Sequence, residues 1–119
     1  QNGPTTYYEN NEGKTGIEYE LLSLFAQSLG VKLTMVVPEN FSSILPMIDK
    51  GKADIAAAGI TVTWTRKENF HFSPAYQEIT PQVIYKNRQQ KKVKSVKSLI
   101  GKKLVVVKGS SHVEILKAE

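Results

Sequence analysis

The sequence contains no cysteine, and this absence excludes disulfide bonds, cysteine-based zinc sites and a thiol nucleophile. It also lacks long apolar runs, because the longest one, from Ile55 to Ile60, is far shorter than the roughly 20 residues of a membrane-spanning helix. The two histidines, His71 and His112, do not have the H-x-x-x-H spacing of a metal-binding helix. We therefore predict no metal site in this chain.

Groups of catalytic side chains are also scarce. Ser110, Ser111 and His112 are adjacent, but neighbouring side chains at the start of a helix do not face one another. The G-x-S-x-G elbow of serine hydrolases is absent. Glu18 and Glu20 lie two positions apart on a predicted helix and point in different directions, so they do not form the carboxylate pair of a glycosidase. The sequence predicts no catalytic residue and no cofactor.

Charge is unevenly distributed along a chain whose composition is otherwise that of an ordinary globular protein, with 40% hydrophobic and 23% charged residues. Residues 1–85 carry six basic and nine acidic residues, a net charge of −3. Residues 86–119 carry ten basic and two acidic residues, a net charge of +8. This change predicts a linker or boundary near Lys86.

The basic residues just after this boundary admit two interpretations. They are Arg88, Lys91, Lys92, Lys94 and Lys97. A nucleic-acid surface is one interpretation, but no aromatic side chains alternate with the lysines as binding of a single strand requires. We favour the other, a solvated hinge linker, and expect no nucleic-acid partner. A weak electrostatic role near anionic lipid or peptidoglycan remains open.

The first half of the chain predicts alternating helices and strands. Residues 1–16 have turn chemistry and predict a loop. A helix is predicted over 17–29, because apolar residues recur at helical spacing and Gly30 suits its end. A strand is predicted over 32–37, then a second helix with Ser42 or Ser43 as its cap. This helix would bury Ile44, Leu45 and Ile48 and stop at Gly51. The apolar run 54–59 predicts a buried central strand. This order is typical of an α/β fold with an open parallel sheet.

The second half continues the pattern. Strands are predicted over 70–72, 82–86 and 104–107, followed by a helix that opens at Gly109-Ser110-Ser111 and packs Val113, Ile115 and Leu116. No strand is predicted before the first helix, and the last strand and helix begin a unit that is not finished. We therefore expect a fragment of a two-lobed domain.

The residues with the clearest potential for binding follow the predicted strand 54–59. The carboxyl ends of such strands are where open α/β sheets bind ligands. Gly59 allows a ligand to approach the backbone, Thr61 offers a hydroxyl, and Arg66 offers a planar set of donors suited to a carboxylate or phosphate. The alternative is a polar loop with a surface arginine.

Five ordered motifs resemble those of the family 3 extracellular solute-binding proteins, which bind polar amino acids. They are Gly16-Ile17-Glu18-Tyr19-Glu20-Leu21, the segment from Phe41 to Gly59, Ala58-Gly59-Ile60-Thr61-x-Thr63-x-x-Arg66, Phe72-Ser73-Pro74-Ala75-Tyr76, and Leu99 to Ser111. Within this superfamily, three stretches resemble the solute-binding-like domain of membrane-bound lytic murein transglycosylases of the F type. These are Pro4 to Tyr8, Gln82 to Lys86 and Val107 to His112.

The resemblance implies roles only at matching positions. Arg66 matches the arginine that clamps a ligand carboxylate, and Thr61 matches a residue that donates to the same carboxylate. Gly59 and Ala58 match backbone positions that meet the ligand. The resemblance places Ser111 at a second-lobe helix N-terminus that favours an anion. It places Tyr8, or Thr6, near the aromatic wall over the ligand side chain. The family's acidic partner for the ligand ammonium comes from beyond Glu119.

Together, these observations predict a type II periplasmic-binding-protein-like α/β fold, with the first lobe and the start of the second. We predict lobe 1 over 1–86, a basic hinge over 87–98 and the start of lobe 2 over 99–119.

The predicted function is non-catalytic binding of a small carboxylate ligand, an amino acid or a peptidoglycan-derived peptide, in a regulatory domain of a murein transglycosylase. Partners would be peptidoglycan or a fused lysozyme-like domain, and the location the periplasm, with outer-membrane association. The alternatives are an amino-acid-binding subunit of an ABC importer and a sensor module of a histidine kinase.

Overall fold

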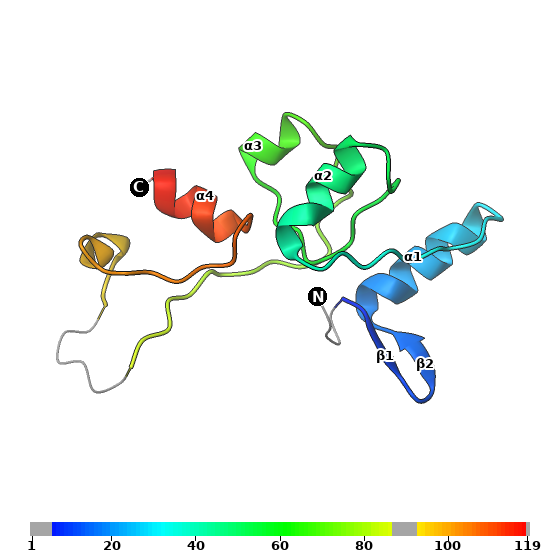
Figure 1. The fold of residues 1–119 in the computed structure, drawn as a ribbon, viewed down its shortest axis with the longest axis horizontal. Helices are drawn as coiled ribbons and strands as arrows, with labels where there is room; N and C mark the ends of the chain where they lie inside the picture. The colour runs from blue at the N-terminus through cyan, green and yellow to red at the C-terminus, as the bar shows by residue number, and fades with distance from the viewer. Residues whose placement is uncertain (1–5, 87–92, 119) are drawn as a thin grey trace. The chain divides into compact units, whose positions relative to one another are not determined.

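The computed structural model describes residues 6–86 and 93–118 (Figure 1). The chain divides into two compact units, Gln1–Thr61 and Val62–Glu119. Within the described ranges, no helix is long and apolar enough to cross a membrane. The lobe boundaries that we place at residues 86 and 99 stay a prediction, and residues 87–92 of the predicted hinge lie outside the described residues.

The first unit begins with a β-hairpin. Strands β1 (Tyr8–Asn10) and β2 (Gly13–Thr15) pair antiparallel, with Tyr8 opposite Thr15 and Asn10 opposite Gly13 (Figure 1). The side chain of Asn10 accepts a hydrogen bond from the backbone N–H of Glu12 at 2.9 Å, which is the local bond that favours asparagine in turns. The turn that the residues Asn10-Asn11-Glu12-Gly13 predict is confirmed. The prediction of a loop over 1–16 is wrong at the two strands, and residues 1–5 lie outside the described residues. The two strands consist of Tyr-Glu-Asn and Gly-Lys-Thr, which lack the alternation of apolar and polar residues by which a strand is recognised.

Helix α1 (Ile17–Ser28) confirms the predicted helix and its end. Gly30 has a φ of +67° and donates to the carbonyl of Gln27 at 3.0 Å, and Val31 donates to that of Ala26 at 3.0 Å. These two bonds form a Schellman motif, which satisfies carbonyls at the end of a helix. Glycine fits the left-handed residue of this motif because it has no Cβ.

Helix α2 (Ile44–Asp49) follows the short 3-10 helix η1 (Phe41–Ser43). The predicted serine cap is not formed: the hydroxyls of Ser42 and Ser43 instead donate to the side-chain oxygen of Asn40, at 2.7 and 2.8 Å. The predicted stop is confirmed, because Gly51 has a φ of +64° and donates to the carbonyl of Ile48 at 2.9 Å. The side chains predicted to be buried here, Ile44, Leu45 and Ile48, are only half-buried.

The predicted parallel sheet is not formed by the residues described. No regular hydrogen-bonded structure is present in the segments 32–37, 54–59, 70–72, 82–86 and 104–107. Among the described residues, 6–86 and 93–118, the β1-β2 hairpin is the one sheet. A strand requires a neighbouring backbone that accepts and donates its ladder of hydrogen bonds, and apolar composition alone does not supply that neighbour. Several of these side chains are exposed instead, up to 97% for Ile84. Helices and strands are both present, but their arrangement is not the open sheet that the sequence predicts.

The second unit contains α3 (Trp64–Lys67), the 3-10 helix η2 (Val96–Leu99) and α4 (Ser111–Ala118). Helix α3 lies in a segment predicted as a loop, and the Thr63 side chain caps it by accepting from the backbone N–H of Arg66 at 3.3 Å. Helix α4 confirms the predicted third helix. Val113 and Leu116 are half-buried as expected, whereas Ile115 is exposed.

Candidate functional site

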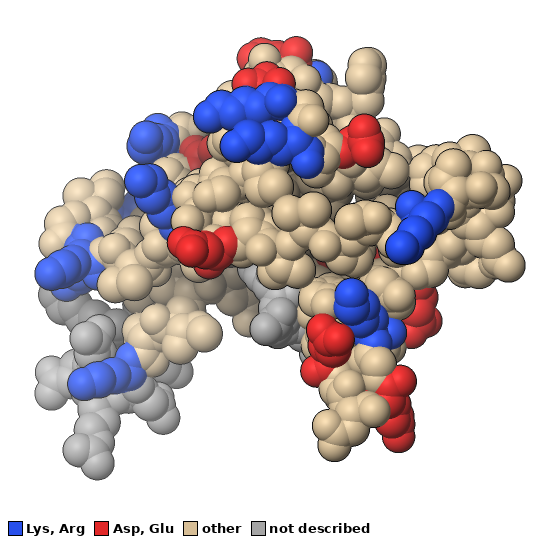
Figure 2. Space-filling view, turned by 45° about the vertical axis from the view of Figure 1, so that its right-hand side comes forward, with Lys and Arg blue, Asp and Glu red and all other residues tan. Residues whose placement is uncertain are grey.

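Arg66 differs from every other basic residue that the structure describes. All described lysines are exposed, and Figure 2 shows lysine side chains at the surface, whereas Arg66 is 4% exposed. Its Nε lies 3.0 Å from Oε1 of Glu114, and its Nη2 donates to the backbone carbonyl of Gly109 at 3.0 Å. A buried charge is costly unless it is paired and hydrogen-bonded, and Arg66 has both kinds of partner.

The second oxygen of Glu114 is bound as well. Oε2 accepts a hydrogen bond from the hydroxyl of Thr63 at 2.7 Å. A carboxylate is therefore held by a guanidinium on one oxygen and a hydroxyl on the other, in a geometry set by α3 and α4 of the second unit. Hydrogen bonds that involve an ionised group are shorter and stronger than those between neutral groups.

Thr63 and Glu114 were not among the residues that we selected from the sequence. Thr63 could have been found from its position, because a threonine just before a polar turn is a favoured helix cap. Glu114 carries no such signal. An acidic residue in the first turn of a helix is ordinary, and its contact with Arg66 is visible only in three dimensions.

The start of α4 contributes two buried serines to the second unit. Ser111 is the first residue of α4, at a helix N-terminus as predicted, and its side chain is buried. Ser110 is also buried, and among the described residues its hydroxyl has no hydrogen-bond partner. Buried hydroxyls normally have a hydrogen-bond partner, so Ser110 is an exception. It was not among the site residues predicted from the sequence.

The remaining predicted site residues belong to the first unit. Ala58 is buried, Thr61 and Tyr8 are half-buried, and Gly59 is exposed. Because Arg66 and Ser111 belong to the second unit, the structure describes two groups of candidate residues. One common site for all six stays a prediction.

The backbone amide of Gly59 has an internal acceptor. It donates to Oε1 of Glu18 at 2.7 Å, across 41 positions of sequence. Glu18 is 4% exposed and lies in the first turn of α1, where the helix dipole favours a negative charge. Gly59 has a φ of +58°, and a Cβ built there meets nothing within 4 Å. Glu18 therefore fixes the loop at Gly59. The space that a side chain at Gly59 would occupy is open.

Glu18→Ala is expected to destabilise the first unit by about 1–3 kcal/mol, because it leaves the Gly59 amide without its acceptor. Hydrogen exchange at the amides of 54–61 and urea unfolding of the intact protein measure this effect. Glu20→Ala is the control, since Glu20 is exposed and is expected to change stability by no more than about 0.5 kcal/mol. Equal effects of the two variants would contradict a role for Glu18 in holding the loop.

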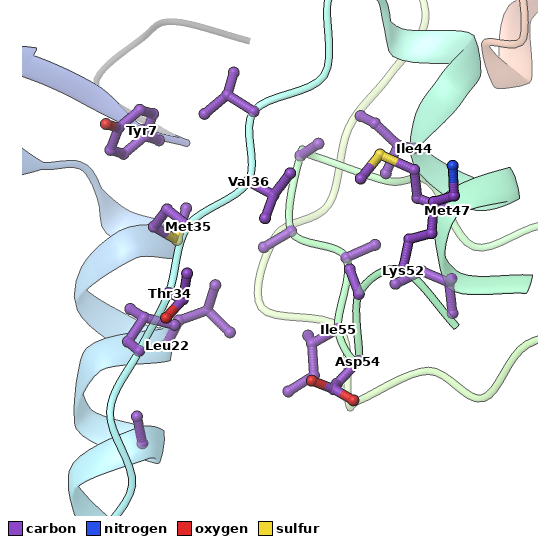
Figure 3. Close-up of a pocket in the computed structure, with 18 of the residues that line it drawn as sticks. Tyr7, Leu22, Thr34, Met35, Val36, Ile44, Met47, Lys52, Asp54 and Ile55 are labelled. Atoms are coloured by element: carbon purple, nitrogen blue, oxygen red, sulfur yellow. The ribbon is translucent and has the colours of Figure 1, made fainter. Parts of the chain in front are cut away.

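A pocket of about 540 Å³ lies in the first unit (Figure 3). Most of its lining is apolar, and the side chains labelled in Figure 3 include Leu22, Met35, Val36, Ile44 and Ile55. Such a lining suits hydrocarbon and offers no guanidinium to a carboxylate. The cationic residues of this lining are Lys32 and Lys52, and Arg66 is not part of it. A carboxylate site at Arg66 stays a prediction. Within the described ranges, no group of three or more His, Cys, Asp or Glu residues could hold a metal ion.

Comparison with known proteins gives a family match and a set of close relatives. A family model for bacterial extracellular solute-binding proteins, family 3, matches residues 1–117. "Membrane-bound lytic murein transglycosylase F" of Pseudomonas putida (strain GB-1) is 41% identical over 117 residues, which cover 98% of this chain and 24% of the relative. The protein of that name from Pseudomonas syringae pv. tomato (strain ATCC BAA-871 / DC3000) is 41% identical over 119 residues, covering 99% of this chain and 24% of the relative. The chain thus spans 24% of the length of these curated relatives.

Proposed function

Because the chain belongs to family 3 of the bacterial extracellular solute-binding proteins, we propose that it binds a small carboxylate-bearing ligand without reacting with it. The observation that carries this proposal is the set of donors around Glu114. Arg66 and Thr63 hold its two carboxylate oxygens at 3.0 and 2.7 Å, so the donors for a carboxylate are already in position. A planar guanidinium suits this task because its donors are arranged in a fixed fork.

The burial of Arg66 supports the same assignment. The strength of an ionic hydrogen bond rises where water is excluded, so a guanidinium that is 4% exposed discriminates between an anion and a neutral group better than the exposed lysines do. Ser111, buried at the start of α4, would add a backbone donor at a helix N-terminus.

The names of the relatives support a more specific role. We propose that this chain is part of the solute-binding-like domain of a murein transglycosylase in the cell envelope. A separate lysozyme-like domain would then carry the catalytic residues. The ligand would then be an amino acid or a peptide released from peptidoglycan, and binding would report the state of the cell wall to the catalytic domain. This context favours a sensor over the subunit of an importer.

The test is calorimetric titration of the intact protein with the twenty amino acids and with peptidoglycan stem peptides. We expect saturable heat with a carboxylate ligand and its loss when the carboxyl group of that ligand is amidated, because an amide does not form the ionic bond with Arg66. Equal heat from the amidated ligand would contradict carboxylate recognition. No heat with any of these compounds would contradict the proposed function.

A further inference from the structure

The carboxylate that now occupies Arg66 belongs to the protein itself. We infer that Glu114 is an internal competitor for this site, so that a ligand carboxylate binds Arg66 and Thr63 only by displacing it. The inference rests on the proposed function and adds a residue that determines specificity. Glu114 holds the place of the ligand: its Oε1 and Oε2 lie where the two oxygens of a bound carboxylate would lie.

The unequal burial of the two partners makes this exchange feasible. The side chain of Arg66 is 4% exposed, whereas that of Glu114 is 32% exposed. Glu114 can therefore turn into water and keep its charge solvated. The guanidinium is buried, so loss of the Glu114 carboxylate without a replacement anion would cost free energy. A ligand carboxylate that replaces Glu114 removes this penalty, and a neutral ligand does not.

The competition also sets a threshold for binding. A ligand carboxylate that binds Arg66 and Thr63 gives up the bonds of the partly exposed Glu114, so it gains less free energy than it would at an unoccupied arginine. The ligand must gain affinity from contacts of its remaining atoms, and a compound that offers only a carboxylate binds weakly. Competition with Glu114 therefore selects ligands that have a carboxylate for Arg66 and Thr63 and further atoms that other residues contact.

Displacement also changes the second unit. Glu114 of α4 forms bonds with Arg66 of α3 and with Thr63, the cap of α3. Thr63 and Glu114 are 51 positions apart in the sequence. When the ligand takes over both donors, these bonds between α3 and α4 are lost, while the bond from Arg66 to the Gly109 carbonyl can stay. Binding thereby breaks one link between the two helices, which is the kind of differential contact that a ligand needs in order to shift a conformational equilibrium.

The experiment measures how accessible Arg66 is to a reagent and to a small carboxylate. Phenylglyoxal, which modifies arginine, is applied to the intact wild-type protein and to Glu114→Gln, and the modification is read at each arginine by peptide mass spectrometry. The chain has two arginines, so Arg88 is an internal reference. Glu68→Gln is the matched control, because it removes the same charge from an exposed residue two positions after Arg66.

We expect Glu114→Gln to raise modification of Arg66 roughly threefold to tenfold over the wild type, with Arg88 and Glu68→Gln unchanged. Acetate, used as the carboxylate probe, should protect Arg66 at a lower concentration in Glu114→Gln than in the wild type. Unchanged modification of Arg66, or equal protection by acetate in both proteins, would overturn the inference. Glu114→Asp, which keeps the charge but is one methylene shorter, replaces Glu114→Gln if the latter does not fold, and should raise modification to a lesser extent.

Titration with stem peptides separates this inference from the proposed function. Higher affinity in Glu114→Gln supports competition, and lower affinity would overturn it, because Glu114 would then contact the ligand. If no stem peptide or amino acid binds either protein, while acetate protects Arg66 as expected, the proposed function fails and the competition at Arg66 stands.

Discussion

Gly16→Ala is expected to destabilise the first unit by roughly 3–5 kcal/mol, one of the two largest effects that we predict. Gly16 has a φ of +127°, a conformation that residues with a side chain rarely adopt. A Cβ at this position would lie 2.5 Å from the carbonyl oxygen of Thr6 and 2.8 Å from its carbonyl carbon. These are backbone atoms, so no side-chain rotation relieves the clash. The Thr6 carbonyl is also held in place, because it accepts a hydrogen bond from Tyr19 at 3.2 Å.

Gly30→Ala is the matched control for this variant. Gly30 also has a positive φ, of +67°, but a Cβ there meets nothing within 4 Å. Its replacement should cost only the conformational term, about 1–2 kcal/mol. Urea unfolding of the intact protein gives the two free energies, and hydrogen exchange at the amides of α1 shows whether the loss is local. If Gly16→Ala is no more destabilising than Gly30→Ala, the close approach of Thr6 to Gly16 does not constrain the fold.

The features that could be predicted from the sequence are those set by neighbouring residues. Helix α1 and its end at Gly30, the stop of α2 at Gly51 and the opening of α4 depend on helical spacing and on glycine at a left-handed position. Both are properties of a few consecutive residues. The short helix α3 was missed, although its cap at Thr63 is equally local, because four residues are too few to show a period.

The features that could not be predicted depend on residues far apart. The predicted parallel sheet requires segments such as 32–37 and 54–59 to find a neighbouring backbone, and composition does not say whether they do. The bond from Gly59 to Glu18 spans 41 positions, and the bond from Arg66 to Gly109 spans 43. Arg66 was selected from the sequence as a donor for a carboxylate, and this role stays a prediction. The ion pair between Arg66 and Glu114 could not be predicted from the sequence, because a charged residue in a helix does not indicate its partner.

Arg66→Ala is the second variant with a large expected effect, and it should weaken both ligand binding and the second unit. Loss of the ionic bonds to a ligand carboxylate lowers affinity by roughly 1.5–3 kcal/mol, which is about tenfold to 150-fold. The stability of the second unit should fall by about 1–3 kcal/mol. This is less than for a fully buried pair, because the side chain of Glu114 is 32% exposed and water compensates for part of the lost partner.

Two further variants distinguish the roles of Arg66. Arg66→Lys keeps the positive charge but loses the planar fork, so it should retain part of the stability while binding a carboxylate nearly as weakly as Arg66→Ala. In the double variant Arg66→Ala/Glu114→Gln, the effects on stability should not add, because the second substitution removes a carboxylate that has already lost its partner. Urea unfolding and calorimetric titration give both quantities for each variant. Additive losses of stability would contradict the ion pair. Affinity that is unchanged in Arg66→Ala would remove Arg66 from the binding site and leave it as a link between α3 and α4.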